Sequence, residues 1–444
     1  MTELAEKPVI KSDPKTRSLL IRYVLTDFTR LIAFNISGMF VVLYVLETVE
    51  PTQAGILFAL NYLILALIDY PTGVLGDIIG YRKVMLVAYF FYVLSFIFLL
   101  VSNSFLTLLI YSGLVAIGAS QESGALESWF DNSYNHYAGN KDPERQLYKS
   151  FQAKKSLVGH LLYGISIVAG GIIAHYFSRK HLFAVTLFLI VIIFILITVI
   201  VKDSYLSKSD FTTSLYFQQF QSGFKFLLSQ KGIFLFFIGT TIIWAANNSI
   251  WVNFLLFPIY GSYSGGQDDI TAMLRALMFT SGVFWQIFIV KYISKIQRIK
   301  LWIFITTAFS NSVFFLFVYF YYLRFPPTGL DLSLVLGLFI IFQLPGIWEP
   351  LEFILRNRLN LDLVPDEIRN SIYSLLPTIT TIIGIPGALI GGYILKTSPF
   401  SSAILVTAIF SGIGVILTGM GLSKLPEIRG NNFNAKNNTN QGVK

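Results

Sequence analysis

Long apolar runs fill almost all of this chain and are separated by short polar turns, and this pattern constrains the fold more than any other feature. A helix needs roughly 20 apolar residues to cross the hydrocarbon core of a bilayer. Because no water is present there, every backbone polar group must be bonded within its own segment, and a helix achieves this. We count twelve such runs, at about 18–46, 52–77, 83–102, 105–130, 147–177, 181–201, 232–258, 269–292, 301–323, 332–356, 370–395 and 401–423. The sequence therefore predicts an all-α membrane protein with twelve transmembrane helices.

The composition excludes most classes of soluble protein. Hydrophobic residues make up 54% of the chain and charged residues only 13%, which is too apolar for a water-soluble domain of this size. The net charge of +9 would suggest nucleic acid in a soluble protein, but in a membrane protein it reflects basic cytoplasmic loops. The sequence has no cysteine, nucleotide loop, metal-ligand spacing or nucleophile elbow. We therefore expect no enzymatic activity, no cofactor, no metal ion and no nucleic-acid partner.

Lys and Arg are distributed unequally between the predicted loops. With both termini in the cytoplasm, the outer loops hold only Arg179, Lys180, Arg324 and Lys396, and the cytoplasmic segments hold the other loop cations. Membrane proteins carry such an excess on the cytoplasmic side. The polar N-terminus lacks the apolar core of a cleavable signal peptide. We expect a multi-pass protein of the plasma or inner membrane with both termini cytoplasmic.

The chain divides into two similar halves. A polar connection, Lys202–Lys231, separates the sixth run from the seventh, and its apolar residues recur at helical spacing, which indicates an amphipathic helix on the membrane surface. Short patterns recur in both halves: Leu126-Glu127, Asn132 and Asn135 match Leu351-Glu352, Asn357 and Asn360. The predicted parts are a cytoplasmic N-terminal tail (1–17), a six-helix bundle (18–201), the cytoplasmic linker (202–231), a second six-helix bundle (232–423) and a disordered cytoplasmic tail (424–444).

A short charged turn, Pro71–Lys83, follows the second apolar run. Asp69, Gly73 and Asp77 recur every four residues and share one helix face, and glycines on such a face let another backbone approach closely. Asp77 ends the apolar run, and two cations follow it. The arrangement is suited to a gate that locks against a partner helix and unlocks again. Its residues are Gly73, Asp77, Gly80, Arg82 and Lys83.

The same turn resembles the signature loop between the second and third helices of the major facilitator superfamily, which has a Gly, an acid four residues on, a Gly three further on and a basic pair. The resemblance implies two six-helix bundles that rock around a central cavity. It also implies that the acid at the end of the fourth helix, Asp131, pairs with Arg82 as part of the gate. Pro71 and Thr72, ahead of the turn, resemble the residues found there in the drug-efflux-like branch of the family. Ser112, by contrast, stands where the family often has an arginine.

Ionisable side chains within the predicted spans mark functional positions, because a charge at the bilayer centre costs several kcal/mol. Asp27 and Arg30 are three residues apart and can pair along one helix face; alternatively Arg30 is the counter-ion of Asp69 or of an anionic substrate. In a continuous fourth helix, Glu122 and Glu127 lie roughly 140° apart, so that Glu122 faces the cavity and Glu127 does not. The candidates for proton coupling are Asp69, Glu122, Asp27, Arg30 and Glu349, with structural pairing as the alternative.

Aromatic and amide side chains are mixed in the seventh and tenth runs. Together they suit a cavity for an amphipathic or aromatic organic molecule, although Asn and Gln also bond neighbouring membrane helices to one another. The candidates for substrate binding are Trp244, Asn247, Asn248, Trp251, Gln343 and Trp348.

These features predict a secondary active transporter that works by alternating access. We expect proton-coupled efflux of an amphipathic compound, with a small organic substrate, protons and the lipid bilayer as partners and a monomer as the functional unit. A proton symporter that imports a sugar, peptide or organic acid is the alternative. A non-transporting membrane sensor on a transporter fold is a second alternative.

Overall fold

The computed structural model describes residues 13–143, 145–202, 213–292, 296–364 and 366–425. Helices joined by short turns make up this part of the chain. Eleven helical segments among the described residues are long and apolar enough to cross a membrane, so the all-α membrane architecture is confirmed. The helix over the eighth predicted run, α11 (Asp268–Tyr292), also forms but is not among these eleven.

The described residues of the N-terminal half form seven helices, because one predicted span is broken. These are α1 (Pro14–Thr48), α2 (Pro51–Ile79), α3 (Tyr81–Leu100), α4 (Phe105–Glu122), α5 (Ala125–Ala138), α6 (Gln146–Tyr176) and α7 (Arg179–Ile200). The helix α8 (Thr213–Ser229) lies in the connection between the halves. The remaining elements are α9 (Lys231–Ala245), η1 (Ala246–Leu256), α10 (Phe257–Tyr263), α11, α12 (Ile299–Ala308), η3 (Phe309–Val313), α13 (Phe314–Arg324), α14 (Leu332–Leu363), α15 (Asp366–Thr397) and α16 (Phe400–Lys424).

Local sequence explains where several helices begin. Pro14 and Pro51 stand at the first positions of α1 and α2, where a fixed φ suits the helix and a missing N–H costs nothing. Asp331 precedes α14, and its carboxylate accepts hydrogen bonds from the backbone N–H of Ser333 at 2.8 Å and of Leu334 at 3.4 Å. Such a cap satisfies N–H groups that have no partner within the helix.

The fourth predicted span is broken between α4 and α5. Gly124 has a φ of 68°, in the left-handed region that glycine adopts readily. The chain therefore changes direction just after Glu122. This break determines how the acidic side chains of the two helices are placed.

Two π-helical segments interrupt the spans on the C-terminal side. The segment η1 joins α9 to α10, and η3 joins α12 to α13. Wide turns of this kind are rare in proteins and are frequent at functional sites. Both segments contain asparagine, Asn247 in η1 and Asn311 in η3.

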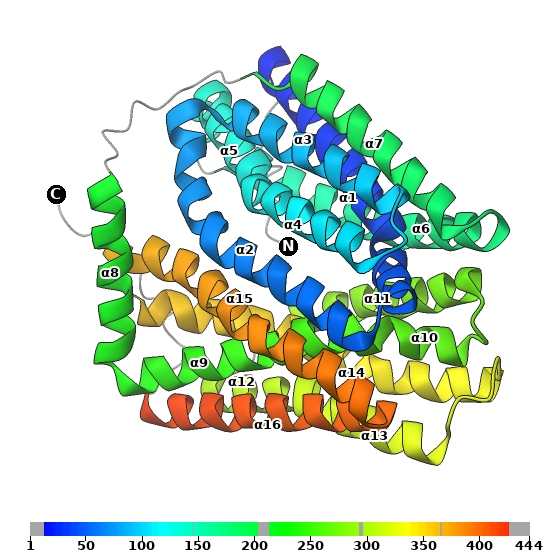
Figure 1. The fold of residues 1–444 in the computed structure, drawn as a ribbon. Coiled ribbons are helices and arrows are strands. Elements are labelled where there is room, and N and C mark those ends of the chain that lie inside the picture. Colours follow the sequence, from blue (N-terminus) through cyan, green and yellow to red (C-terminus); the bar gives the residue numbers. More distant parts are fainter. Residues whose placement is uncertain (1–12, 144, 203–212, 293–295, 365, 426–444) are drawn as a thin grey trace, which may run out of the picture.

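Helices from the two halves of the chain meet at one end of the molecule. Figure 1 shows α2 and α15 converging on the right and diverging to the left, where α8 stands. A Cβ atom on Gly392 of α15 would lie 2.4 Å from the carbonyl oxygen of Pro51, and one on Gly171 of α6 would lie 2.3 Å from the Cβ of Ala272 on α11. These backbones are too close for a side chain at either glycine. We call this end, where α1, α6 and α15 finish, the closed end.

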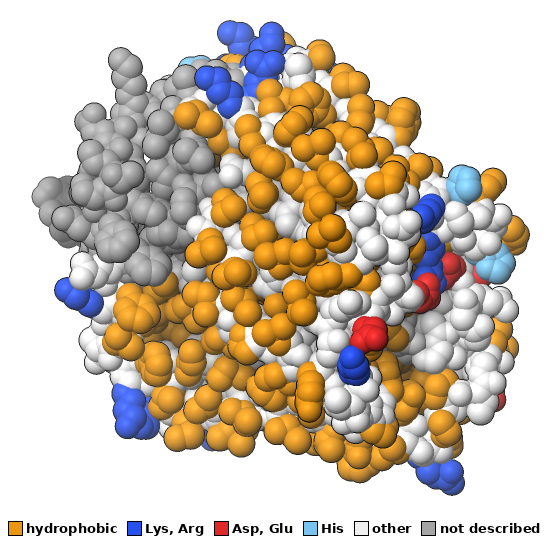
Figure 2. All heavy atoms as spheres, viewed as in Figure 1, with side chains coloured by type: hydrophobic (Ala, Val, Ile, Leu, Met, Phe, Trp, Pro, Cys, Tyr) orange, Lys and Arg blue, Asp and Glu red, His pale blue; other side chains and the backbone are white. Residues whose placement is uncertain are grey.

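The outer surface carries the apolar side chains expected of a membrane protein. Figure 2 shows that the face over α2, α4, α15 and α16 is covered by hydrophobic side chains, with charged groups toward its edges. Many large apolar residues are exposed, among them Leu67 at 65%, Phe188 at 64% and Ile416 at 62%. In water such a surface would aggregate, whereas in a bilayer it contacts lipid.

Candidate functional site

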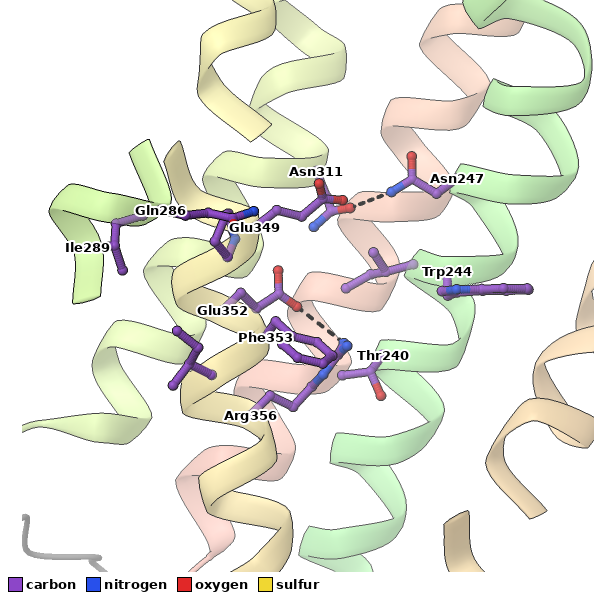
Figure 3. Close-up of a pocket in the computed structure, with 13 residues that line it drawn as sticks. Thr240, Trp244, Asn247, Gln286, Ile289, Asn311, Glu349, Glu352, Phe353 and Arg356 are labelled. Carbon is purple, nitrogen blue, oxygen red and sulfur yellow. Dashed lines mark hydrogen bonds and ion pairs between the residues drawn. The ribbon is translucent and has the colours of Figure 1, made fainter. Parts of the chain in front are cut away.

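A cavity of about 480 Å³ opens among the helices of the C-terminal half. Its walls come from α9, η1, η3, α11 and α14 (Figure 3). Polar and apolar side chains alternate around it, as in sites for small organic molecules. The lining residues used below are Trp244, Asn247, Gln286, Asn311, Glu349, Glu352, Phe353 and Arg356.

Two carboxylates and one cation lie in this cavity, all on α14. Glu352 is buried and accepts a hydrogen bond from Ser310 at 3.0 Å and from Arg356 at 3.4 Å. Glu349 is exposed to the cavity, and none of the described residues forms an ion pair or hydrogen bond with its carboxylate. Figure 3 shows it beside Gln286 and Asn311, one turn from the Glu352–Arg356 pair. The cavity therefore carries an excess of one negative charge.

The two π-helical segments meet at an amide pair on the cavity wall. The side-chain N–H of Asn247 donates to the Oδ1 of Asn311 at 2.9 Å (Figure 3). Asn311 in turn donates to the carbonyl of Thr307 at 3.0 Å and to Ser310 at 2.7 Å. Because Ser310 also holds Glu352, one chain of hydrogen bonds joins η1, η3 and α14. Such a network fixes the direction of the polar groups that face the cavity.

Two aromatic rings complete the wall. Trp244 is 43% exposed and Phe353 is 58% exposed, and both line the cavity. A ring on a cavity wall offers an apolar face and a region of negative potential to a bound molecule. Figure 3 places Phe353 beside Glu352 and Trp244 on the neighbouring α9.

A second charged group lies in the N-terminal half and is centred on Arg30. The Arg30 guanidinium bonds Asp27 at 2.7 Å, Glu122 at 2.8 Å and Glu127 at 3.2 Å. The pairing of Asp27 with Arg30 follows the expected spacing. The expectation that Glu122 and Glu127 lie on different faces is wrong, because the break at Gly124 turns both acids toward one cation.

Lys155 of α6 completes this group. Its ammonium lies 2.8 Å from Asp27 and donates to the hydroxyl of Tyr23 at 2.9 Å. Three carboxylates therefore share two cations, Arg30 and Lys155. All are held within membrane-spanning helices, where ionisable side chains pair with one another.

Ion pairs between the halves hold the closed end. Arg179 at the start of α7 donates to both carboxylate oxygens of Asp268 on α11, at 2.8 and 3.1 Å, and also binds Glu47 of α1. Lys396 of α15 binds Glu50, before α2, at 2.6 Å. His175 lies 3.4 Å from Asp269. The sequence predicts Arg179 and Lys396 only as cations of the outer loops and does not indicate these partners.

The structure describes the side chains of only some of the predicted gate residues. Gly73 and Asp77 are in α2, as is Asp69, but the placement of their side chains lies outside the described residues. Gly80 ends α2 with a φ of 95°, and the exposed Lys83 follows in α3.

Asp131, which the family resemblance predicts to pair with Arg82, contacts another cation in the structure. Asp131 forms an ion pair with Arg145, whereas Arg82 donates to the carbonyl of Thr198 at 2.5 Å. Arg145 stacks on Tyr148, 4.1 Å from the ring centre.

Asp142 lies nearby, between α5 and α6. Desolvation raises the pKa of its carboxyl group, but hydrogen bonds from the Tyr134 hydroxyl and from backbone N–H groups lower it by more, so this pKa is below its usual value.

The predicted substrate residues separate into two groups. Trp244 and Asn247 line the cavity. Trp251 does not, since it is only 4% exposed and packs on Phe314 and Phe315 in the core.

The other three candidates also lie outside the cavity lining. Asn248 bonds the carbonyl of Trp244, Gln343 accepts from the indole of Trp285, and Trp348 packs on Phe309. A helical face read with 3.6 residues per turn does not hold across η1, because the π-helical segment changes which side chains point inward.

Asn311 and Arg356 line the cavity but were not among the residues predicted for the site. Asn311 lies in an apolar run with no other polar neighbour except Ser310 and Ser312, and this polar cluster was the available signal. Arg356 was counted as a cytoplasmic loop cation, but α14 continues to Leu363 and carries Arg356 into the cavity. The i, i+4 spacing from Glu352 to Arg356 would have indicated their ion pair.

The chain matches the family model described as Major Facilitator Superfamily over residues 24–348. Its fold is similar to that of the nucleoside transporter NupG, crystallised as a point mutant, with a TM-score of 0.73 and 13% sequence identity over 92% of this chain and 100% of that one. A POT family transporter in complex with a thioalcohol-conjugated peptide aligns with a TM-score of 0.64 and 12% identity, over 90% of this chain and 94% of that one.

No curated protein matches the sequence. At such low identities the structural likeness shows the fold alone, and it agrees with the family match. Because the family model covers well over half of the chain, the protein belongs to the major facilitator superfamily.

Proposed function

We propose that the protein is a secondary transporter that moves a small organic solute by alternating access between two six-helix halves, residues 18–201 and 232–423. The observation that carries the proposal is the cavity of about 480 Å³ with carboxylate, amide and aromatic walls inside membrane-spanning helices. Polar side chains at this depth are costly unless they face water or a ligand. In transporters of this kind the site lies between helices near the middle of the membrane.

The closed end is the outer side of the membrane in this proposal, and the state described is open toward the cytoplasm. The basic residues concentrated in the segments assigned to the cytoplasm support that orientation. Separation of Arg179 from Asp268 would then open the outer side. The inner side would be closed by the gate residues Gly73, Asp77, Gly80, Arg82 and Lys83 together with Asp131.

Proton coupling belongs to the proposal as well. The Arg30 group is the first place for it, because protonation of Glu122 would release one carboxylate from the shared guanidinium and alter the contact between α1 and α4. Asp27 is held by Lys155 as well as by Arg30, and so has less freedom to change partner. Asp69 remains a candidate from the sequence.

The signature turn favours efflux as the direction of transport, because Pro71 and Thr72 resemble the residues at this place in the efflux-like branch. Uptake is the second candidate. The structural neighbours include a nucleoside transporter and a POT family transporter crystallised with a peptide, both of which act on small organic solutes or bind them. Because those chains are less than 15% identical to this one, they do not decide the direction.

Transport can be tested with the purified full chain in proteoliposomes. Radiolabelled cationic, neutral and acidic organic solutes would be screened for flux with and without an imposed pH gradient. Saturable flux that responds to the gradient supports a proton-coupled transporter, and its direction relative to the gradient separates efflux from uptake. Absence of flux for every solute class, with correctly folded protein, would contradict the proposal.

A further inference from the structure

Glu349 differs from the other membrane-embedded acids whose side chains the structure describes. Asp27, Glu122 and Glu127 bond Arg30, and Glu352 bonds Arg356. The carboxylate of Glu349 has no such partner among the described residues, although it is exposed in the cavity. A charged group that is held inside a membrane without a partner is expensive. The carboxylate of Glu349 is therefore a group that a bound solute can pair with.

Among the described residues, the one cation that lines the cavity is already paired. Arg356 lines the cavity but bonds Glu352 at 3.4 Å. Arg275, on α11, donates to the hydroxyl of Tyr163 on α6 at 3.2 Å and is not part of the lining. The lining thus offers a carboxylate and no unpaired cation, so an anionic solute would find repulsion at Glu349 and no opposing charge.

Aromatic surface lies on the wall of the cavity that also holds the acids. Trp244 and Phe353 are 43% and 58% exposed on the wall of the same cavity. A ring face attracts a cation, most strongly where water is excluded, and also packs against a flat apolar body. A carboxylate and exposed rings within one cavity form a combination that can recognise an ammonium group carried on an apolar molecule.

From this arrangement we infer the substrate class: a monovalent organic cation with an aromatic body, whose ammonium group lies against Glu349 and whose ring packs on Trp244 and Phe353. This inference rests on the proposed transport function, and it assigns Glu349 to the solute rather than to the proton. One positive charge matches the single excess negative charge of the lining. The Asn247–Asn311 pair presents amide groups to any polar substituent.

Equilibrium binding to the full chain in lipid nanodiscs tests the inference. Three ligands of similar shape differ in charge: benzyltrimethylammonium (cation), benzyldimethylamine N-oxide (neutral) and benzylsulfonate (anion). Isothermal titration calorimetry should give the cation an affinity about tenfold or more above that of the N-oxide, which corresponds to about 1.4 kcal/mol, and the sulfonate should bind most weakly. Equal affinities for the cation and the N-oxide, or no binding of the cation by the folded chain, overturn the inference.

Variants locate the charge that is responsible. Glu349→Gln keeps the shape of the side chain and should abolish the preference for the cation. Asp331→Asn removes a negative charge from the start of the same helix, outside the cavity, and keeps a residue suited to capping; its preference should match the unaltered chain. Trp244→Leu should weaken cation binding several-fold. Persistence of the preference in Glu349→Gln, with normal thermal unfolding, refutes the assignment.

Binding and flux fail independently. Selective binding of the cation without any transport leaves the substrate class standing and removes the proposed function. Transport of neutral or anionic solutes with no selective binding of the cation leaves the proposed transport function standing and removes the inferred substrate class.

Discussion

Replacement of Arg179 by Gln should shift the protein toward a state that is open at the closed end. The guanidinium joins α7 to α11 through two hydrogen bonds to Asp268, at 2.8 and 3.1 Å, and it reaches Glu47 of α1 as well. Gln removes the positive charge and cannot form both bonds in the same geometry. In the proposed mechanism the halves separate when this end opens, so the interaction would stabilise only the closed arrangement.

The magnitude follows from the burial of the pair. The side chains of Arg179 and Asp268 are 17% and 15% exposed. Breaking a fully buried pair costs about 3–5 kcal/mol, and an exposed pair contributes about 0–1 kcal/mol. An intermediate value of about 2 kcal/mol corresponds to roughly a thirty-fold change in the ratio of closed to open molecules.

Spin-label distances can measure this ratio, because the chain has no cysteine. Labels on cysteines introduced at the exposed positions Phe177 and Gln267 report the separation between α6 and α11. The Arg179→Gln variant in nanodiscs should show a second, longer distance population. Lys396→Gln is the matched control, because the Lys396 and Glu50 side chains are 49% and 62% exposed and their pair contributes little.

Two results would refute this reasoning. Unchanged distances in Arg179→Gln would mean that the ion pair does not hold the halves together. An equal shift in Lys396→Gln would mean that burial does not determine the strength of these contacts.

Three further predictions concern other parts of the fold. Gly392→Ala should open the closed end, because the new Cβ would lie 2.4 Å from the Pro51 carbonyl oxygen. Gly261→Ala is the control and should leave this end closed, because nothing lies within 4 Å of a Cβ at that position. The spin-label distances between Phe177 and Gln267 measure both effects. Arg30→Gln should lower the free energy of unfolding by about 3 kcal/mol, because three carboxylates lose a shared cation. The double variant Arg30→Gln/Glu122→Gln should be more stable in thermal unfolding than Arg30→Gln alone. If the effects of the two substitutions simply add, the three carboxylates do not share this cation. Asp77→Asn should abolish flux in proteoliposomes with folding intact, and full activity would contradict the gate.

The membrane architecture could be predicted from the sequence because the bilayer imposes it directly. Each apolar run must become a helix, and its length is set by the membrane rather than by neighbouring residues. The predicted runs agree with the helices to within a few residues at most ends. The exceptions are the fourth, seventh and tenth runs, predicted to end at 130, 258 and 356, whose helices continue to Ala138, Tyr263 and Leu363. The spacing of Asp27 and Arg30 also predicted their ion pair.

The site could be predicted only in part, because it depends on departures from regular helix geometry. The left-handed Gly124 turns Glu122 and Glu127 toward the same cation. The π-helical η1 leaves Trp251 in the core while Asn247 faces the cavity. Neither departure has a signature in the periodicity of apolar residues.

Contacts between distant segments were also beyond the sequence. Arg179 and Asp268 are each ordinary charges at the end of a helix, and nothing local indicates that they meet. Their pairing depends on how α6 packs along α11. That packing is permitted by the absence of a side chain at Gly171.

The central claim is that the polar cavity is a passage reached from one side of the membrane at a time. A single cysteine at Phe353, which is 58% exposed on the cavity wall, can be labelled in oriented vesicles with a membrane-impermeant thiol reagent. We expect labelling from the cytoplasmic side in the otherwise unaltered chain, and added labelling from the outer side when Arg179→Gln is also present. Equal labelling from both sides in every variant, or labelling from neither side, would contradict it.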